Sequence, residues 1–223
     1  RRVAMLGDEL FVGTASSGVF RYRLHEDTPR QQLAVAGRSG QSVPADHPGE
    51  VDPETSVTSL DFDGRWVAAG LAGGYVHLWD ADGNSVFGQD LDQMEPLSRD
   101  GPSYVLLQDG FLYAASGRWL RRWRLPGPDA SRQKVLETDS EQLPARVHSL
   151  APGAPDGGRL LVGLATGEVD VRGADLHLLL RHPAGGCAVS AVRAVSQGIV
   201  TGADDGEVVL WQLGAGGLER GGL

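Results

Sequence analysis

The feature that most constrains the fold of this chain is an internal repeat. A short apolar run followed by a longer, glycine-interrupted run occurs at 57–60 with 66–79, at 147–150 with 161–172 and at 189–192 with 198–211. Two looser copies cover 3–6 with 10–23 and 104–107 with 111–123. Self-similarity of this kind indicates that one small structural unit is used several times along the chain.

The spacing of the copies narrows the kind of unit. When they are aligned on the position that holds Trp79 and Trp211, the equivalent residues are 23, 79, 123, 172 and 211, with spacings of 56, 44, 49 and 39. Such periods are typical of four-stranded propeller blades and are too long for leucine-rich or ankyrin repeats.

Each copy has the pattern of short β-strands. Turns rich in Gly and Asp, such as 203–206, separate the runs, and 32 Gly and 12 Pro in 223 residues favour many tight turns over helices. The third run, as in 208–211, is almost wholly apolar, which indicates a strand covered on both faces. Weaker fourth strands are predicted at 31–36, 85–88, 134–137 and 177–180, and helical periodicity is absent over any long window.

At these residues the sequence resembles the WD40-repeat β-propeller family. The residues that carry the resemblance are Leu78-Trp79-Asp80, with the Trp-Asp pair that names the family, and 201–206 leading into Leu210-Trp211. The resemblance implies an all-β propeller of four-stranded antiparallel blades, with repeats at about 1–36, 57–88, 103–137, 147–181 and 189–223. It also implies structural roles for a set of residues in the blades, namely Trp79, Asp80, Trp123, Thr201, Asp205 and Trp211.

The sequence departs from the family pattern in one consistent way. The family often carries Gly-His before the first strand, and the matching positions hold no His; they are Pro53, Arg99, Leu143 and Gly185. The buried His-Asp-Ser/Thr-Trp network of the family is therefore expected to be incomplete in every blade, and the blades to be less stable.

Five copies leave the number of blades open. Propellers have four to eight blades, and this family most often has seven. The chain is expected to be either part of a longer ring or a closed five-bladed ring within a single domain, 1–223.

Charge and cysteine content argue against several classes of function. Lys and Arg number 20 and Asp and Glu 29, a net charge of −9, which argues against a general nucleic-acid-binding protein. The single cysteine, Cys187, argues against a disulfide framework or a Cys-rich zinc site and is compatible with the cytoplasm or nucleus. No apolar run approaches the length of a membrane helix.

Three segments that join successive repeats carry almost all of the net charge. Segments 37–56 and 88–103 each have a net charge of −3, and 137–146 has −2. The family topology implies that these connectors lie on one face, which would attract a basic partner. The alternative is that they are solvated loops. The candidate partner-binding acids are Asp46, Glu50, Asp52, Glu54, Asp90, Asp92, Glu95, Glu137, Asp139 and Glu141.

A basic, aromatic segment stands out against this acidity. Residues 117–124 hold four Arg and two Trp, which could stack on nucleic acid or pair with phosphate. The alternative, which we favour, is a third strand in which the Arg stems lie along neighbouring blades. Arg118 and Trp119 fall at the preceding hairpin turn and are candidate partner-binding residues.

Patterns that would indicate catalysis or metal binding are absent from the sequence. No His stands at a recognisable ligand spacing, and His177 and His182, which flank a predicted strand, are expected at the surface. Cys187 is expected to be an unreactive residue in a loop. Residues 204–206 are expected to form a hairpin turn rather than a calcium site.

The sequence therefore predicts a non-catalytic interaction scaffold that displays propeller loops to a peptide or protein. No catalytic, cofactor-binding or metal-binding residue is predicted, and neither a membrane nor a small-molecule substrate is indicated. Two alternatives remain. One is a lyase or quinoprotein-like propeller enzyme, although inner runs such as 57–60 offer only small hydroxyls. The other is an RNA-binding propeller that uses Arg118–Arg124.

Overall fold

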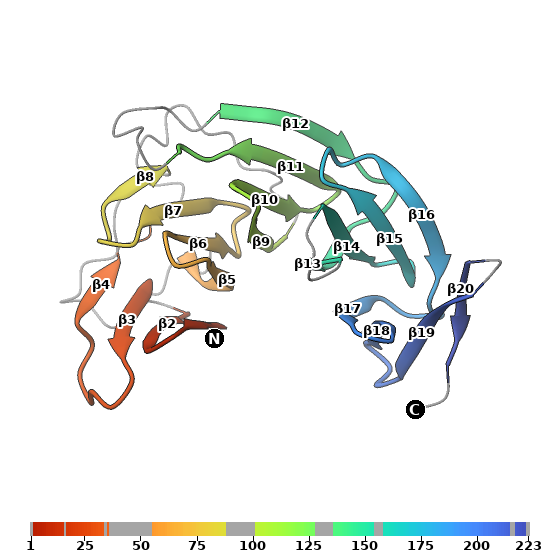
Figure 1. Ribbon diagram of the computed structural model, residues 1–223, viewed down its shortest axis with the longest axis horizontal. Coiled ribbons are helices and arrows are strands. Elements are labelled where there is room, and N and C mark those ends of the chain that lie inside the picture. Colours follow the sequence, from red (N-terminus) through yellow and green to blue (C-terminus); the bar gives the residue numbers. More distant parts are fainter. Residues whose placement is uncertain are drawn as a thin grey trace. The chain divides into compact units, whose positions relative to one another are not determined.

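The computed structural model describes residues 2–15, 17–33, 35, 55–87, 101–127, 136–153, 158–214 and 217–221. The described residues contain no α-helix. The strands form five four-stranded antiparallel sheets (Figure 1). In each sheet the strands lie side by side in sequence order, so every sheet is a simple meander. The all-β, repeated architecture predicted from the sequence is confirmed.

The chain divides into two compact units, residues 1–117 with 123–137 and residues 118–122 with 138–223. The first unit contains the first two sheets and part of the third. Its first two sheets are built from β1 (Arg2–Leu6), β2 (Glu9–Gly13), β3 (Val19–Arg23), β4 (Gln31–Leu33), β5 (Val57–Phe62), β6 (Trp66–Leu71), β7 (Val76–Asp80) and β8 (Ser85–Phe87).

The third sheet contains residues of both units, and the fourth and fifth belong to the second unit. Their strands are β9 (Ser103–Gln108), β10 (Phe111–Ser116), β11 (Trp119–Arg124), β12 (Leu136–Gln142), β13 (Val147–Pro152), β14 (Arg159–Leu164), β15 (Glu168–Gly173), β16 (Leu178–Pro183), β17 (Val189–Val195), β18 (Gly198–Ala203), β19 (Val208–Gly214) and β20 (Gly217–Arg220).

The second strand of the second sheet, β6, is buried on both faces. On β6, Val67 and Ala69 pack toward the first sheet, whereas Trp66 and Ala68 pack toward the third. A strand whose alternate side chains enter two different cores must be apolar at every position. This explains the near-continuous apolar runs in the sequence.

Tight turns join the second and third strands. Gly74, Gly167 and Gly206 occupy equivalent turns and have φ values of 86°, 85° and 87°. A side chain is strained in this left-handed region, so glycine is required there. The predicted hairpin at 204–206 is confirmed.

Two fourth strands differ from the sequence prediction. The strand expected at 134–137 is β12, which runs from Leu136 to Gln142. After the apolar run 208–211 no fourth strand is predicted, yet β20 pairs with β19 from Trp211↔Arg220 to Gly214↔Gly217. Both strands are rich in polar residues and lie at the edge of their sheets, where one-sided burial gives only a weak apolar pattern.

Candidate functional site

The candidate acidic residues fall into two groups. Those of the first two connectors, Asp46, Glu50, Asp52, Glu54, Asp90, Asp92 and Glu95, lie outside the described residues. Glu137, Asp139 and Glu141 lie on β12. The expectation that 137–146 is a loop connector is therefore wrong for its first six residues, which form a sheet-edge strand.

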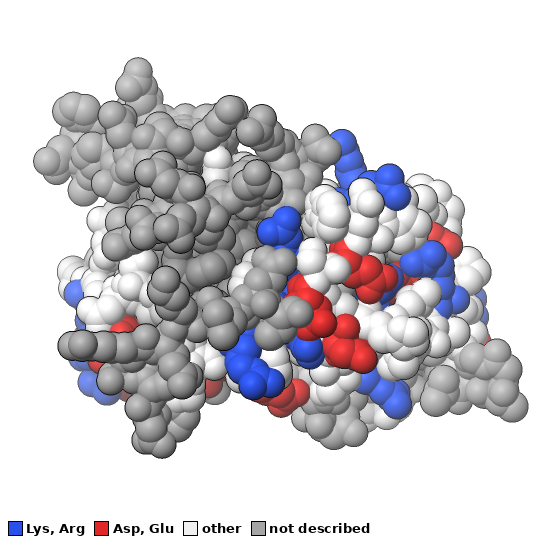
Figure 2. Space-filling model, turned by 90° about the horizontal axis from the view of Figure 1, so that it is seen from above, with Lys and Arg blue, Asp and Glu red and all other residues white. Residues whose placement is uncertain are grey.

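Asp139 and Glu141 of β12 are paired within the protein. Arg122 Nε donates to Asp139 Oδ2 at 2.9 Å, and Arg122 Nη1 donates to the Ala174 carbonyl at 2.6 Å. Glu141 Oε2 lies 2.6 Å from Arg172 Nη1. Among the described residues of the face in Figure 2, Asp and Glu side chains are intermingled with Lys and Arg. These two acids therefore tie β12 to its neighbours, and an arginine offsets the charge of each.

Arg172 is the centre of a buried ionic cluster. Its side chain is 1% exposed, and Nη2 lies 2.8 Å from Oδ2 of the wholly buried Asp170. Arg181 contacts the same carboxylate at 2.7 Å, and this ion pair raises the pKa of the Arg181 guanidinium. Arg172 also donates to the Leu176 carbonyl at 2.7 Å. The cluster satisfies a buried charge with several charge-assisted hydrogen bonds.

The Arg118–Trp119 turn is anchored by a reciprocal pair of hydrogen bonds. Arg118 Nε donates to the Leu143 carbonyl at 2.8 Å, and the Leu143 amide donates to the Arg118 carbonyl at 2.7 Å. Arg118 is exposed and lies in the turn, whereas Trp119, expected in the turn, is the half-buried first residue of β11. The Arg121 guanidinium lies 5.8 Å from the Trp119 ring centroid. The turn therefore presents a cation and an indole from a fixed backbone.

The small hydroxyls on the first strands of the sheets join one sheet to the next. Ser59 Oγ donates to the Ser103 carbonyl at 3.0 Å and accepts from the Val105 amide at 2.9 Å. At the equivalent place in the fourth sheet, Ser149 Oγ donates to the Val189 carbonyl at 2.8 Å. These hydroxyls have structural partners.

Asp61 makes a further joint between sheets. Its Oδ2 accepts from the Leu107 amide at 2.7 Å and its Oδ1 from the Phe62 amide at 3.0 Å. Burial raises the pKa of the Asp61 carboxyl despite these two hydrogen bonds. Sequence reasoning missed this residue, because its partner lies 46 residues away.

The tryptophans are on third strands, as predicted. Trp79 lies on β7, Trp123 on β11 and Trp211 on β19, and all three are buried. Trp211 Nε1 donates to Thr201 Oγ1 at 2.8 Å, so the fifth sheet retains this link of the family network. Asp80 accepts from the Asn84 amide at 2.8 Å and holds the turn between β7 and β8.

The two histidines near β16 have different surroundings. His177 is exposed, as predicted. His182, expected at the surface, is half-buried: its ring packs edge-on against Trp211 at 4.6 Å between centroids, and burial lowers its pKa. It lies within β16, where its side chain turns toward the fifth sheet.

Cys187 lies in the loop between β16 and β17, as expected. Hydrogen bonding to Asp205 and the negative charge of that carboxylate raise the pKa of its thiol. Among the described residues, no group of three or more His, Cys, Asp or Glu could hold a metal ion. Within the same ranges, no helix is long and apolar enough to cross a membrane.

Comparison with known proteins identifies both the repeat and the fold. Residues 47–80 match the family model described as WD domain, G-beta repeat. The WD40 β-propeller domain of Doa1 is 13% identical, with a TM-score of 0.65 over 98% of this chain and 66% of that chain. A chain of the mitotic checkpoint complex is 15% identical, with a TM-score of 0.69 over 94% of this chain and 60% of that chain.

The designed Ika4 protein is 21% identical, with a TM-score of 0.54 over 75% of this chain and 95% of that chain. No curated protein sequence matches. At these identities the solved structures show the fold, and this chain spans 60% and 66% of the mitotic checkpoint and Doa1 chains. The chain thus contains a WD40 repeat and has the β-propeller fold of WD40 domains, as the resemblance of its repeats predicts.

Proposed function

We propose that this chain is a non-catalytic scaffold that binds a protein partner through the Arg118–Trp119 turn. WD40 propellers commonly mediate protein–protein interaction, and the cross-bonded sheets of this chain suit the rigid display of turns. The observation that carries the proposal is the anchored turn itself, in which the Leu143 backbone fixes an exposed Arg beside a half-buried Trp.

Arg and Trp are the residue types that most often dominate binding energy at protein interfaces. A turn whose backbone is already ordered loses little conformational entropy when it binds. Arg118 keeps the rest of its guanidinium for a partner carboxylate or carbonyl, because its hydrogen bond to the Leu143 carbonyl uses only Nε. The partner surface that fits this turn is a carboxylate or carbonyl next to an apolar patch.

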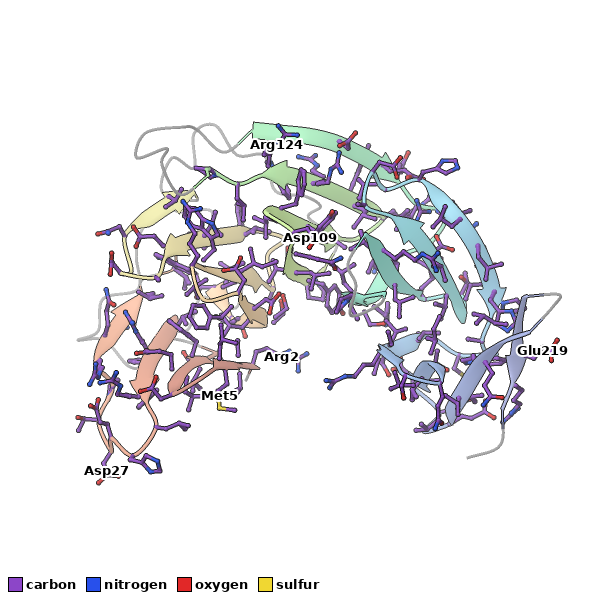
Figure 3. The ribbon with its side chains drawn as sticks, viewed as in Figure 1. Arg2, Met5, Asp27, Asp109, Arg124 and Glu219 are labelled. Atoms are coloured by element: carbon purple, nitrogen blue, oxygen red, sulfur yellow. The ribbon has the colours of Figure 1, made fainter. Side chains whose placement is uncertain are left out.

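The test is recovery of partners from a lysate with the parent chain and with Arg118→Glu. The matched control is Arg124→Glu, which makes the same charge change at the other end of β11 (Figure 3). Arg118→Glu should reduce recovery of the main partners about tenfold and Arg124→Glu should leave it unchanged. Equal recovery with all three proteins would refute a role for this turn.

The acidic connectors support a second candidate surface. Segments 37–56 and 88–103 each have a net charge of −3, whereas arginines offset two of the acids on β12. We propose that these two connectors attract a basic partner surface. Changing Asp46, Glu50, Asp52 and Glu54 to their amides should slow association more than it speeds dissociation, because exposed charges act mainly on encounter.

The RNA-binding alternative has a separate test. RNA binding through Arg118–Arg124 would be strongly salt-dependent, and absence of RNA binding at low salt would exclude it. Arg122 is already bound to Asp139 and Ala174, which reduces the positive charge available to RNA.

We also propose a reducing compartment, the cytoplasm or nucleus, because the chain has one cysteine.

A further inference from the structure

A groove of about 430 Å³ opens between the fourth and fifth sheets, within the second unit. It lies at the end of these sheets where β13 connects to β14 and β17 to β18. Arg159, Leu161, Leu179, Leu180, Ile199 and Leu218 are among its lining residues. This volume is within the range of pockets that hold small ligands or single side chains of a partner.

The floor of the groove is the core between the two sheets. Leu161, Ile199 and Leu218 belong to that core and are at most 9% exposed, and Leu180 packs against it. At the rim, Leu179 is 53% exposed. An apolar side chain entering here would extend an existing core and cover an apolar residue that is otherwise in water.

Among the described residues that line the groove, Arg159 is the charged one. Arg159 is exposed, and no ion pair or side-chain hydrogen bond joins it to another described residue. Nearby, by contrast, Arg172 and Arg181 contact Asp170. Side chains alternate along a strand, so Glu219 lies on the face of β20 opposite Leu218, and Figure 3 shows it pointing away from β19.

We propose that this groove binds a short protein segment in which an aliphatic or aromatic side chain lies close to a carboxylate. The apolar side chain enters between Leu180 and Leu218, and the carboxylate pairs with Arg159, whose planar guanidinium suits bidentate pairing. The inference rests on the proposed protein-binding function but uses a different surface, because Arg118 and Arg159 lie at opposite ends of the β-sheets.

The probe is a set of fluorescent six-residue peptides that each contain one Asp and one Leu or Phe, in every order and spacing, on a Ser background. Fluorescence anisotropy should detect at least one peptide with a Kd below about 1 mM. Replacing its Asp by Lys, or its Leu or Phe by Ser, should weaken binding about tenfold or more.

Two variants with matched controls place the site. Arg159→Glu should weaken binding about tenfold, whereas Arg146→Glu, the same change at an exposed residue before β13, should change it less than about twofold. Leu179→Ser should weaken binding, whereas Val208→Ser, at a residue 52% exposed on β19, should not. Urea midpoints equal to that of the parent would show that all four variants are folded.

Two outcomes would overturn the groove proposal: no peptide in the set binds, or binding is unchanged in both Arg159→Glu and Leu179→Ser. Loss of lysate partners in Arg118→Glu alongside either outcome would retain the proposed scaffold function and reject this groove. Peptide binding that depends on Arg159, without any effect of Arg118→Glu, would support the groove and reject the turn.

Discussion

Arg172 and Asp170, two residues apart on β15, form an ion pair of 2.8 Å in which both side chains are buried. Arg172 stands at the position that holds Trp79 and Trp211 in the second and fifth sheets. The fourth sheet therefore has a guanidinium where those two sheets have an indole, and Asp170, Glu141 and the Leu176 carbonyl accept its hydrogen bonds.

Truncating Arg172 should strongly destabilise the protein. Arg172→Ala leaves the buried Asp170 with one arginine in place of two, and removal of one partner from a buried pair costs about 3–5 kcal/mol. Arg172→Met, which keeps the apolar stem, should cost less. Arg220→Ala, which removes a surface ion pair to Glu207, should change the free energy of unfolding by at most about 1 kcal/mol in urea titrations. Equal effects of the two alanine variants would contradict this account.

Gly163 lies opposite Ser149, whose hydroxyl joins the fourth sheet to the fifth, and should tolerate no side chain. A Cβ on Gly163 would lie 2.2 Å from Ser149 Oγ and 2.6 Å from the Val189 carbonyl, whereas a Cβ on the equivalent Gly202 meets its first neighbour, Ala191 Cβ, at 3.6 Å. Gly163→Ala should therefore cost about 1–3 kcal/mol by overpacking, and Gly202→Ala less than about 1. Urea unfolding of both variants checks the difference, and a Gly163→Ala midpoint equal to that of the parent would count against the close joint.

The core of each sheet could be predicted from sequence because its signal is local. Apolar runs and Gly-containing turns predict the first three strands of each repeat. Two edge strands, β12 and β20, differ from the prediction: β12, with the sequence LETDSEQ, has no apolar alternation, and β20 has only four residues. Two acids of β12 pair with Arg122 on β11 and Arg172 on β15. The chain passes through β13 and β14 before it reaches Arg172, so no local pattern in the sequence reveals this second pair.

The candidate site was less accessible to sequence reasoning. The acids of β12 can be recognised as acids, but not as partners of buried or half-buried arginines. The groove combines residues from 153 to 218 on two sheets, and no spacing in the sequence brings them together. One signal was present: an Arg at a position where other repeats hold Trp, with Asp170 two residues before it, indicates a buried ion pair.

The tryptophans on the third strands should be essential to the core. Trp79 packs with the core between the first two sheets and Trp211 with that between the last two. Trp→Ala at either position should cost about 3–5 kcal/mol, as for other large core truncations. Thr201→Val, which removes only the acceptor of the Trp211 indole, should cost about 1–2 kcal/mol. Urea midpoints unchanged from the parent would place these residues outside the core.

His182 should make stability depend on pH in the acidic range. Its pKa in the folded protein is below the ordinary value of 6.5, because burial disfavours the charged ring. The unfolded chain then binds more protons between the two pKa values, so stability falls as pH drops below about 6.5. His182→Phe, which keeps an aromatic ring against Trp211, should lose this part of the pH dependence.

The control for this titration is His177→Phe, at an exposed residue next to β16. Chemical denaturation between pH 7.5 and 5.5 should give parallel curves for His177→Phe and the parent. A parent whose stability follows that of His182→Phe across the range would show that His182 titrates alike in both states.

Cys187 should react slowly with alkylating reagents because of Asp205. The carboxylate of Asp205 raises the pKa of the Cys187 thiol, chiefly by a hydrogen bond and also by its charge, and Asp204 adds a smaller effect. The thiolate is the nucleophile, so Asp205→Asn should speed alkylation by iodoacetamide at pH 8 by about twofold to tenfold. Asp204→Asn changes the same charge one residue away and should speed it less. In the parent, the Glu207 amide donates to Asp205 Oδ1 at 3.0 Å. The side-chain carbonyl introduced by Asp205→Asn can accept the same hydrogen bond, so the turn should stay folded. Equal rates for the parent and Asp205→Asn, measured by mass spectrometry, would show that Asp205 does not control the thiol.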